Sequence, residues 1–192
     1  MTKSKRGVND ITEFLEVAHI VNLVKNAKTI PYILDTETKT RRDRALLSCL
    51  ALTGLRVSEV LSIDVNQFED TPKTVWIKNV KILKRRAEHI TRPFALPKQG
   101  IFSDLSMLIL EHKDTIKKGK LFDINRASAW RIITYMTGFW CHYFRSQRIS
   151  HLVNKFRSTV MVADFQGIKA PATISHYYKG DTRRHEQELS EA

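Results

Sequence analysis

The sequence predicts a mainly α-helical domain with one small antiparallel β-sheet or hairpin, an α+β fold. Apolar residues recur at helical spacing over most of the chain, whereas residues 74–97 are rich in β-branched and aromatic residues. The 192 residues are 42% hydrophobic, enough for one domain to bury a core without a metal or a disulfide. A disordered polyelectrolyte is therefore excluded.

The first half of the chain is expected to be helical. Asp10 and Glu13 form a capping box at the start of the first pattern, and the polar run 35–40 interrupts it. Gly54 ends the second pattern, because glycine readily takes the left-handed conformation that closes a helix. The three expected helices cover residues 11–26, 42–52 and 56–61.

The second half of the chain begins with the sheet. Residues 74–97 are expected to form two antiparallel strands around a densely basic turn. Residues 181–192 carry charges of both signs and are expected to form a tail or a weakly amphipathic helix. Helical patterns return over residues 105–113, 126–136, 141–154 and 158–166.

Charge gives the first indication of a partner. The chain has 32 Lys and Arg against 20 Asp and Glu, a net charge of +12, which favours an anionic polymer over a basic surface kept for solubility alone. The apolar run 45–55 is too short to span a bilayer, and the basic start does not lead into a signal peptide. We expect a cytoplasmic protein with no membrane partner, in which Cys49 and Cys141 are reduced core thiols.

Three groups of polar residues differ from this background. Arg56 follows a glycine between two apolar helices, where Glu59 on the same helical face can neutralise it, so a purely structural ion pair is an equally good interpretation. His142 and Arg145 are spaced to share one face of a later helix. Tyr177 lies near the end of the chain among basic residues.

Together these groups supply what a metal-free phosphodiester transfer requires. Guanidinium groups bind non-bridging phosphate oxygens two at a time and stabilise the charge of the transition state. Histidine and lysine can move protons near neutral pH, and a tyrosine can hold the phosphate covalently. The sequence shows no carboxylate cluster suited to two metal ions, so we expect neither a metal nor a cofactor.

The segment 53–59, Thr-Gly-Leu-Arg-Val-Ser-Glu, resembles the tyrosine recombinases, the family of phage integrases and Xer-type enzymes. The likeness continues through Arg-Pro-Phe-Ala-Leu-Pro at 92–97, the His-x-x-Arg of the later helix and the terminal tyrosine, in the family's order and spacing. The segment 163–177 is most similar to integrases of archaeal viruses and integrated elements. The resemblance implies a catalytic domain over residues 1–180, without the helical core-binding domain that precedes it in most members, and a tail that packs on a neighbouring protomer.

The resemblance also implies roles for single residues. Arg56 and Arg145 would clamp the scissile phosphate, and His142 would assist proton transfer. Tyr177 would attack the phosphate to give a 3′-phosphotyrosyl link. Tyr178, the next residue, is the alternative nucleophile.

A lysine in the hairpin would protonate the departing 5′ oxygen. Lys84 is the first choice because it enters the turn, with Lys81 and Lys78 as alternatives. Lys84 is an equally good candidate for a simple phosphate contact. Further DNA contacts are expected at Lys81, Arg85, Arg86 and Lys169.

One position departs from the family pattern. Ile168 stands where the family has a histidine or tryptophan. The favoured interpretation is a site-specific recombinase that cleaves and rejoins double-stranded DNA, monomeric when free and a homotetramer on paired sites. The alternative is a DNA-binding remnant or regulator of the same fold with impaired chemistry, and a protein–protein adaptor is a third, less favoured hypothesis.

Overall fold

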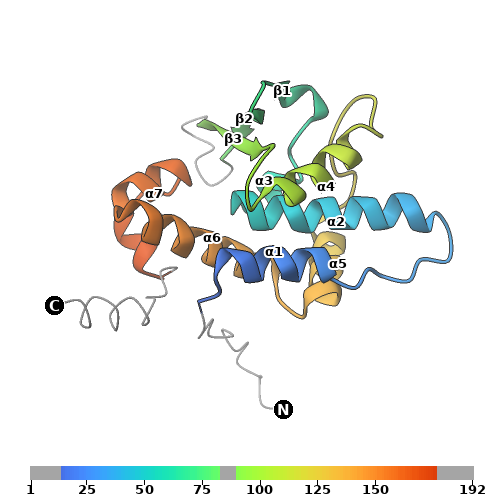
Figure 1. The fold of residues 1–192 in the computed structure, drawn as a ribbon, viewed down its shortest axis with the longest axis horizontal. Helices are drawn as coiled ribbons and strands as arrows, with labels where there is room; N and C mark the ends of the chain where they lie inside the picture. The colour runs from blue at the N-terminus through green and yellow to red at the C-terminus, as the bar shows by residue number, and fades with distance from the viewer. Residues whose placement is uncertain (1–13, 83–89, 177–192) are drawn as a thin grey trace, which may run out of the picture.

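The computed structural model describes residues 14–82 and 90–176 (Figure 1). It confirms a mostly helical fold with one small antiparallel sheet. Within these ranges no helix is long and apolar enough to cross a membrane. The helices and strands are α1 Val17–Asn26, α2 Thr36–Thr53, α3 Val57–Val60, β1 Phe68–Asp70, β2 Thr74–Lys81, β3 Thr91–Pro97, α4 Ser103–Lys113, α5 Arg126–Thr137, α6 Cys141–Phe156 and α7 Thr159–Phe165. Short 3-10 helices cover Val65–Gln67 and Pro171–His176.

Helix α2 is the centre of the fold. It is buried continuously from Ala45 to Thr53 and packs against α1, α4, α5 and α6. The sheet and α4 lie on one side of it and α1 on the other (Figure 1). Cys49 lies within this buried run, and Cys141 is buried at the start of α6. Burial raises the pKa of the Cys49 thiol to about 12 and that of Cys141 to about 11, so both are core thiols as expected.

The sheet has three antiparallel strands in the order β1-β2-β3. The strand β1 was not anticipated, because its three residues are too few to show an alternating pattern. The register between β2 and β3 shifts between Ile77 and Val80, where Asn79 has a left-handed backbone with φ of 54°. The basic turn between β2 and β3 lies outside the described residues.

Helix α1 begins at Val17, later than the predicted position 11, and residues 14–16 are not helical. A tertiary contact accounts for the difference. The Leu15 N–H donates to Gln147 Oε1 at 3.1 Å, and the Leu15 carbonyl oxygen lies 2.6 Å from His151 Nε2, so this segment is bound to α6. The proposed capping box of residues 10 and 13 lies outside the described residues.

Helix α2 begins at Thr36, so the predicted break over residues 35–40 is wrong for all but its first residue. Polar side chains hold this first turn in place of apolar packing. The Thr36 hydroxyl donates to the Tyr32 carbonyl oxygen at 2.7 Å, and Arg41 pairs with Glu37 at 2.5 Å one turn away. The spacing of apolar residues does not reveal a helical turn that polar side chains stabilise.

The burial of His151 predicts a dependence of stability on pH. Burial lowers the pKa of His151, with a further contribution from Arg148, whereas the unfolded chain binds this proton near a pH of about 6.5. Stability should therefore fall as the pH drops below about 6.5, by up to about 1.4 kcal/mol per pH unit. Thermal melts at pH 7.5 and 5.5 should show a smaller difference in His151→Gln, which keeps a donor but cannot titrate.

Gln147→Met is the matched control for this measurement. It removes the other contact to Leu15 without removing a titratable group, so it should lower the melting temperature equally at both pH values. A His151→Gln variant with the pH dependence of the wild type would contradict the assignment.

Candidate active site

Arg56 immediately precedes α3 and pairs with Glu59. Its Nη1 donates to Glu59 Oε1 at 2.9 Å, and its backbone N–H donates to Glu59 Oε2 at 2.8 Å. The Glu59 side chain is fully buried, whereas that of Arg56 is 18% exposed. The expected ion pair is therefore present. It holds the partly exposed Arg56 side chain against the buried Glu59 carboxylate. One nitrogen of the guanidinium is engaged, and a guanidinium has five N–H groups with which to bind oxygen.

Arg145 is fully buried on α6 and binds the C-terminal end of α2. Its Nη1 donates to the Gly54 carbonyl oxygen at 2.7 Å and to Gln166 Oε1 at 3.3 Å. The last carbonyl groups of a helix have no N–H donors within the helix, and the helix dipole makes this end negative. A cation at this position meets both needs, because it gains oxygen ligands and supplies donors to the helix end.

Arg145 and Arg56 are both linked to Gly54, the first by a hydrogen bond and the second by its position in the chain. Arg145 binds the carbonyl group of this residue, and Arg56 follows it by two positions. Gly54 has φ of 67°, so it both ends α2 and turns the chain into α3. His142 lies one helical turn before Arg145, half-buried, with its ring 5.5 Å from that of Trp140. The structure thus places Arg56 and Arg145 at this turn and His142 one helical turn from Arg145 on α6.

The segment after α7 contacts Arg145 and the C-terminal end of α2. Gln166 is fully buried against Arg145 and Thr53, and sequence reasoning gave it no role. Its spacing offered a signal, because it follows the buried Val162 by one helical turn on the same face. Ile168 is 7% exposed and belongs to a small apolar cluster of α6 and α7, so this position is filled by core packing. Lys169 is exposed in the following bend.

The hairpin meets this same segment. An added Cβ atom at Gly167 would lie 2.8 Å from Ile82 Cγ2, so the end of β2 packs closely on the backbone after α7. Lys81 is exposed at this end, whereas Lys78 pairs with Glu69 on β1. The predicted residues Lys84, Arg85, Arg86, Tyr177 and Tyr178 lie outside the described residues.

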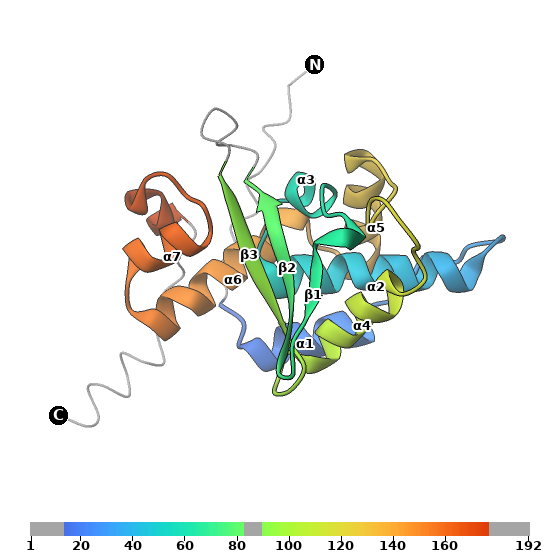
Figure 2. The same cartoon turned by 90° about the horizontal axis from the view of Figure 1, so that it is seen from above.

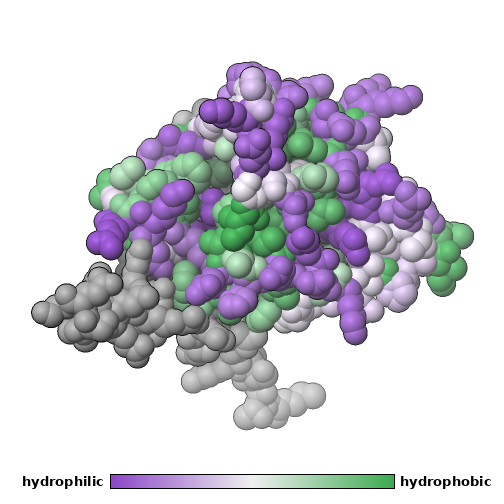
Figure 3. All heavy atoms as spheres, in the orientation of Figure 1, coloured by the Kyte–Doolittle hydropathy of each residue, from purple (hydrophilic) through white to green (hydrophobic). Residues whose placement is uncertain are grey.

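Several of the elements around this site lie on one side of the molecule. Viewed from above the sheet, α3, α5 and the hairpin end of β2 and β3 lie toward one side, and α1 and α4 lie toward the other (Figure 2). On α5, Arg126, Trp130 and Arg131 are exposed, two cations with an aromatic ring that sequence reasoning did not select. The opposite side, which carries α1, mixes hydrophobic with hydrophilic residues (Figure 3).

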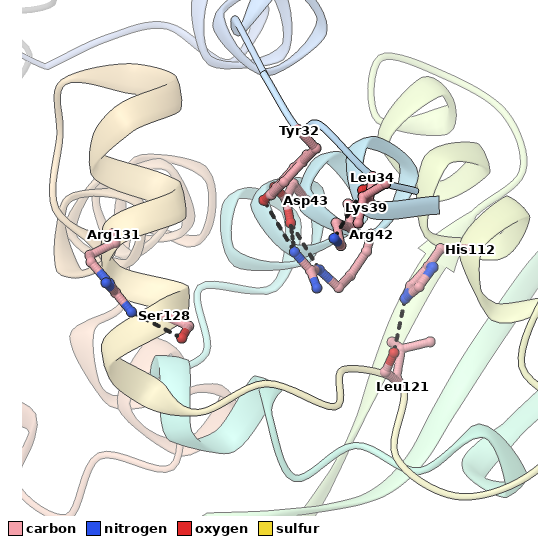
Figure 4. Close-up of polar contacts among 9 residues, drawn as sticks. All are labelled: Tyr32, Leu34, Lys39, Arg42, Asp43, His112, Leu121, Ser128 and Arg131. Atoms are coloured by element: carbon pink, nitrogen blue, oxygen red, sulfur yellow. Dashed lines mark hydrogen bonds and ion pairs between the residues drawn. The ribbon is translucent and has the colours of Figure 1, made fainter. Parts of the chain in front are cut away.

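A second polar cluster lies at the N-terminal end of α2 (Figure 4). Asp43 is fully buried, pairs with Arg42 at 2.8 Å and accepts a hydrogen bond from the Tyr32 hydroxyl. Burial and this carboxylate raise the pKa of Tyr32 to about 12, so Tyr32 is a neutral donor and a poor nucleophile. A pocket of about 340 Å³ beside the cluster is lined by Ile30, Tyr32, Lys39, Arg42, Ile124, Ser128, Arg131 and Ile132.

The guanidinium groups at the Gly54 turn suit an anionic ligand. In residues 14–82 and 90–176, no group of three or more His, Cys, Asp and Glu side chains is placed to hold a metal ion. Two guanidinium groups at this turn, with an imidazole one helical turn from Arg145, provide donors for phosphate oxygens and a proton carrier.

The chain is similar in sequence or in fold to several known proteins. The model of the phage integrase family matches residues 13–184. No curated protein sequence matches the chain significantly. The XerH site-specific recombinase, in a post-cleavage complex with its palindromic difH substrate, is similar with a TM-score of 0.67 at 16% identity, over 91% of this chain and 50% of that one. The XerA recombinase has a TM-score of 0.67 at 15% identity, over 98% of this chain and 66% of that one. The chain thus spans about half the length of XerH and two thirds of XerA.

Gly54 and Gly138 form a matched pair for testing the turn. Both end a helix with a left-handed backbone, at φ of 67° and 74°. An added Cβ atom at Gly54 would lie 2.9 Å from Arg148 Cβ and Cγ, whereas at Gly138 nothing lies within 4 Å. Gly138→Ala should cost only backbone strain, about 1 kcal/mol, and Gly54→Ala about 3 kcal/mol because α6 must also move.

Urea unfolding of the two variants measures this difference. Equal losses would mean that α6 does not pack against the turn as described. The Gly54→Ala variant should also impair any activity that depends on Arg145, since Arg145 and Arg148 lie on the same helix.

Proposed function

The chain belongs to the phage integrase family, and we propose that it is the catalytic domain of a tyrosine recombinase that cleaves and rejoins double-stranded DNA. The observation that carries the proposal is the bond from Arg145 to the Gly54 carbonyl oxygen, two residues before Arg56. This bond holds Arg145, from a distant part of the chain, at the turn that Arg56 follows. Such a pair of guanidinium groups suits a phosphodiester, which presents two non-bridging oxygens and gains negative charge during transfer.

The proposed chemistry balances without a cofactor. The Tyr177 oxygen bonds to the scissile phosphorus while the bond to the 5′ oxygen of the next nucleotide breaks, which leaves a 3′-phosphotyrosyl link. Lys84 donates a proton to the departing 5′ oxygen, and His142 assists proton transfer by accepting the proton that Tyr177 loses. Rejoining reverses these steps, so the phosphodiester energy is kept. The ordinary tyrosine pKa is near 10, and the nearby arginines would favour the reactive phenolate.

Glu59 has a supporting part in this proposal. Its buried carboxylate holds both the backbone and the side chain of Arg56, so the guanidinium is oriented before DNA arrives. The ion pair and the catalytic role of Arg56 are therefore compatible. Phosphate binding would use the remaining N–H groups of Arg56.

One observation favours a second candidate, a DNA-binding remnant or regulator with impaired chemistry. Ile168 is buried in an apolar cluster and provides no polar side chain where the family has a histidine or tryptophan. A remnant would bind DNA and form no covalent link. Lys169, exposed beside it, is proposed as a DNA contact in either case.

The proposal extends to assembly. XerH is bound to a palindromic substrate, and a palindrome presents two related half-sites. For this chain we infer a free monomer that assembles as a homotetramer on paired DNA sites in the cytoplasm. In this scheme residues 1–180 form the catalytic unit, and the tail 181–192 packs on the neighbouring protomer.

The two tyrosines near the end of the chain test the chemistry directly. A nicked duplex that carries the protein's recombination site, incubated with the protein without metal, should give a slowly migrating band on a denaturing protein gel. The band should disappear in Tyr177→Phe and persist in Tyr178→Phe. The reverse pattern would exchange the two roles. Salt-sensitive binding with no band in the wild type would favour the impaired remnant.

Arg126 and Arg131 test the DNA-binding side. If both contact phosphates, each alanine variant should reduce the slope of log affinity against log salt by about 1, and should weaken binding equally on all sequences. Lys25→Ala is the control, because Lys25 pairs with Asp104 on α4, on the opposite side. An equal loss in all three variants, measured by fluorescence anisotropy, would contradict the proposed face.

A further inference from the structure

Gln166 is buried at the heart of the site, although the proposed chemistry gives it no role. It directly follows α7, and its side chain bridges two other elements. Its Oε1 accepts a hydrogen bond from Arg145 Nη1 at 3.3 Å, and its Nε2 donates to the Thr53 carbonyl oxygen at 3.0 Å. Its own carbonyl oxygen lies 3.5 Å from Arg145 Nη2. One residue therefore contacts both the guanidinium and the helix end that binds it.

We propose that Gln166 is a positioning residue for Arg145 and sets the plane in which the guanidinium meets the scissile phosphate. The inference rests on the proposed function. Arg145 Nη1 donates to both Gly54 and Gln166, so fixed atoms of α2 and of the segment after α7 hold this edge of the group. With the contact of Nη2 to the Gln166 carbonyl oxygen, these bonds fix the plane of the guanidinium, and that plane decides how the group can meet phosphate oxygens.

The carboxamide of Gln166 matches this position. It must present an acceptor to Arg145 and a donor to Thr53, and a carboxamide carries one of each. In Gln166→Glu, a second oxygen would face the Thr53 carbonyl oxygen, and the new negative charge would compete with phosphate for the guanidinium. In Gln166→Met, similar in length, Arg145 loses an oxygen ligand and Thr53 loses a donor.

The same residue connects Arg145 to the hairpin. The Gln166 N–H donates to the Val162 carbonyl oxygen at 2.9 Å, which fixes the residue to α7. Helix α7 in turn contacts β3, where Arg92 pairs with Asp164 at 2.5 Å. The strand pair that carries the proposed leaving-group lysine and the helix that carries Arg145 are therefore both fixed to this short helix.

The chain offers a matched control in Gln147, a second buried glutamine, which lies on the same helix as Arg145 and binds Leu15. Gln166→Met and Gln147→Met each remove a buried amide. At saturating protein, Gln166→Met should slow single-turnover formation of the covalent adduct about 100-fold with little change in DNA affinity. Gln147→Met should lower the melting temperature by a similar amount and leave the rate within about twofold. Equal rates in the two variants would overturn the inference.

A double-mutant cycle separates positioning from a general structural effect. If Gln166 acts through Arg145, Gln166→Met should slow Arg145→Ala no further. If the double variant instead loses the product of the two single rate reductions, Gln166 acts independently of Arg145, and the inference is overturned.

A readout without catalysis keeps this inference distinct from the proposed function. In protein labelled with ¹⁵N-arginine, the Nε–H signal of Arg145, assigned by its loss in Arg145→Lys, should shift or broaden in Gln166→Met and stay unchanged in Gln147→Met. An unchanged signal in Gln166→Met would overturn the positioning role. This comparison holds even if the wild type forms no adduct, a result that would count against the proposed chemistry alone.

Discussion

The structure depends on burying one guanidinium at the end of one helix. Helix α2 must satisfy its last carbonyl groups inside the protein, and Arg145 must find oxygen ligands away from water. The bond from Arg145 to Gly54, with Gln166 bridging Arg145 and Thr53, meets both requirements. Removing either partner would leave buried polar groups unsatisfied, so the contact that would stabilise the fold is also the contact that would orient the arginine for phosphate.

The placement of the other elements follows from this contact. The left-handed backbone at Gly54 turns the chain so that Arg56 emerges beside the same helix end, where the buried Glu59 holds it. The segment after α7 brings Gln166 to the guanidinium, and Gly167 allows the end of β2 to approach closely. The end of α2, helix α6 and the segment after α7 meet here.

Local features could be predicted from the sequence. The helix end at Gly54, the start of α3 after Arg56 and the shared helix of His142 and Arg145 depend on neighbouring residues, and the structure has them all. The starts of α1 and α2 could not be predicted, because the contact of Leu15 with α6 and the polar first turn of α2 decide them. The role of Gln166 was not evident either, since its burial depends on how α7 docks. Ile168 was a departure in the sequence, and the structure shows core packing there.

The central claim is that Arg145, held at the end of α2, stabilises negative charge on the scissile phosphate. The most direct test compares cleavage of a normal duplex with cleavage of one that carries an uncharged methylphosphonate at the scissile position. The account predicts that Arg145→Ala slows cleavage of the normal duplex about 1000-fold and that of the methylphosphonate far less, because the latter has no charge to stabilise. An equal loss of cleavage rate on both substrates would contradict this role of Arg145 and would mean that Arg145 only stabilises the end of α2.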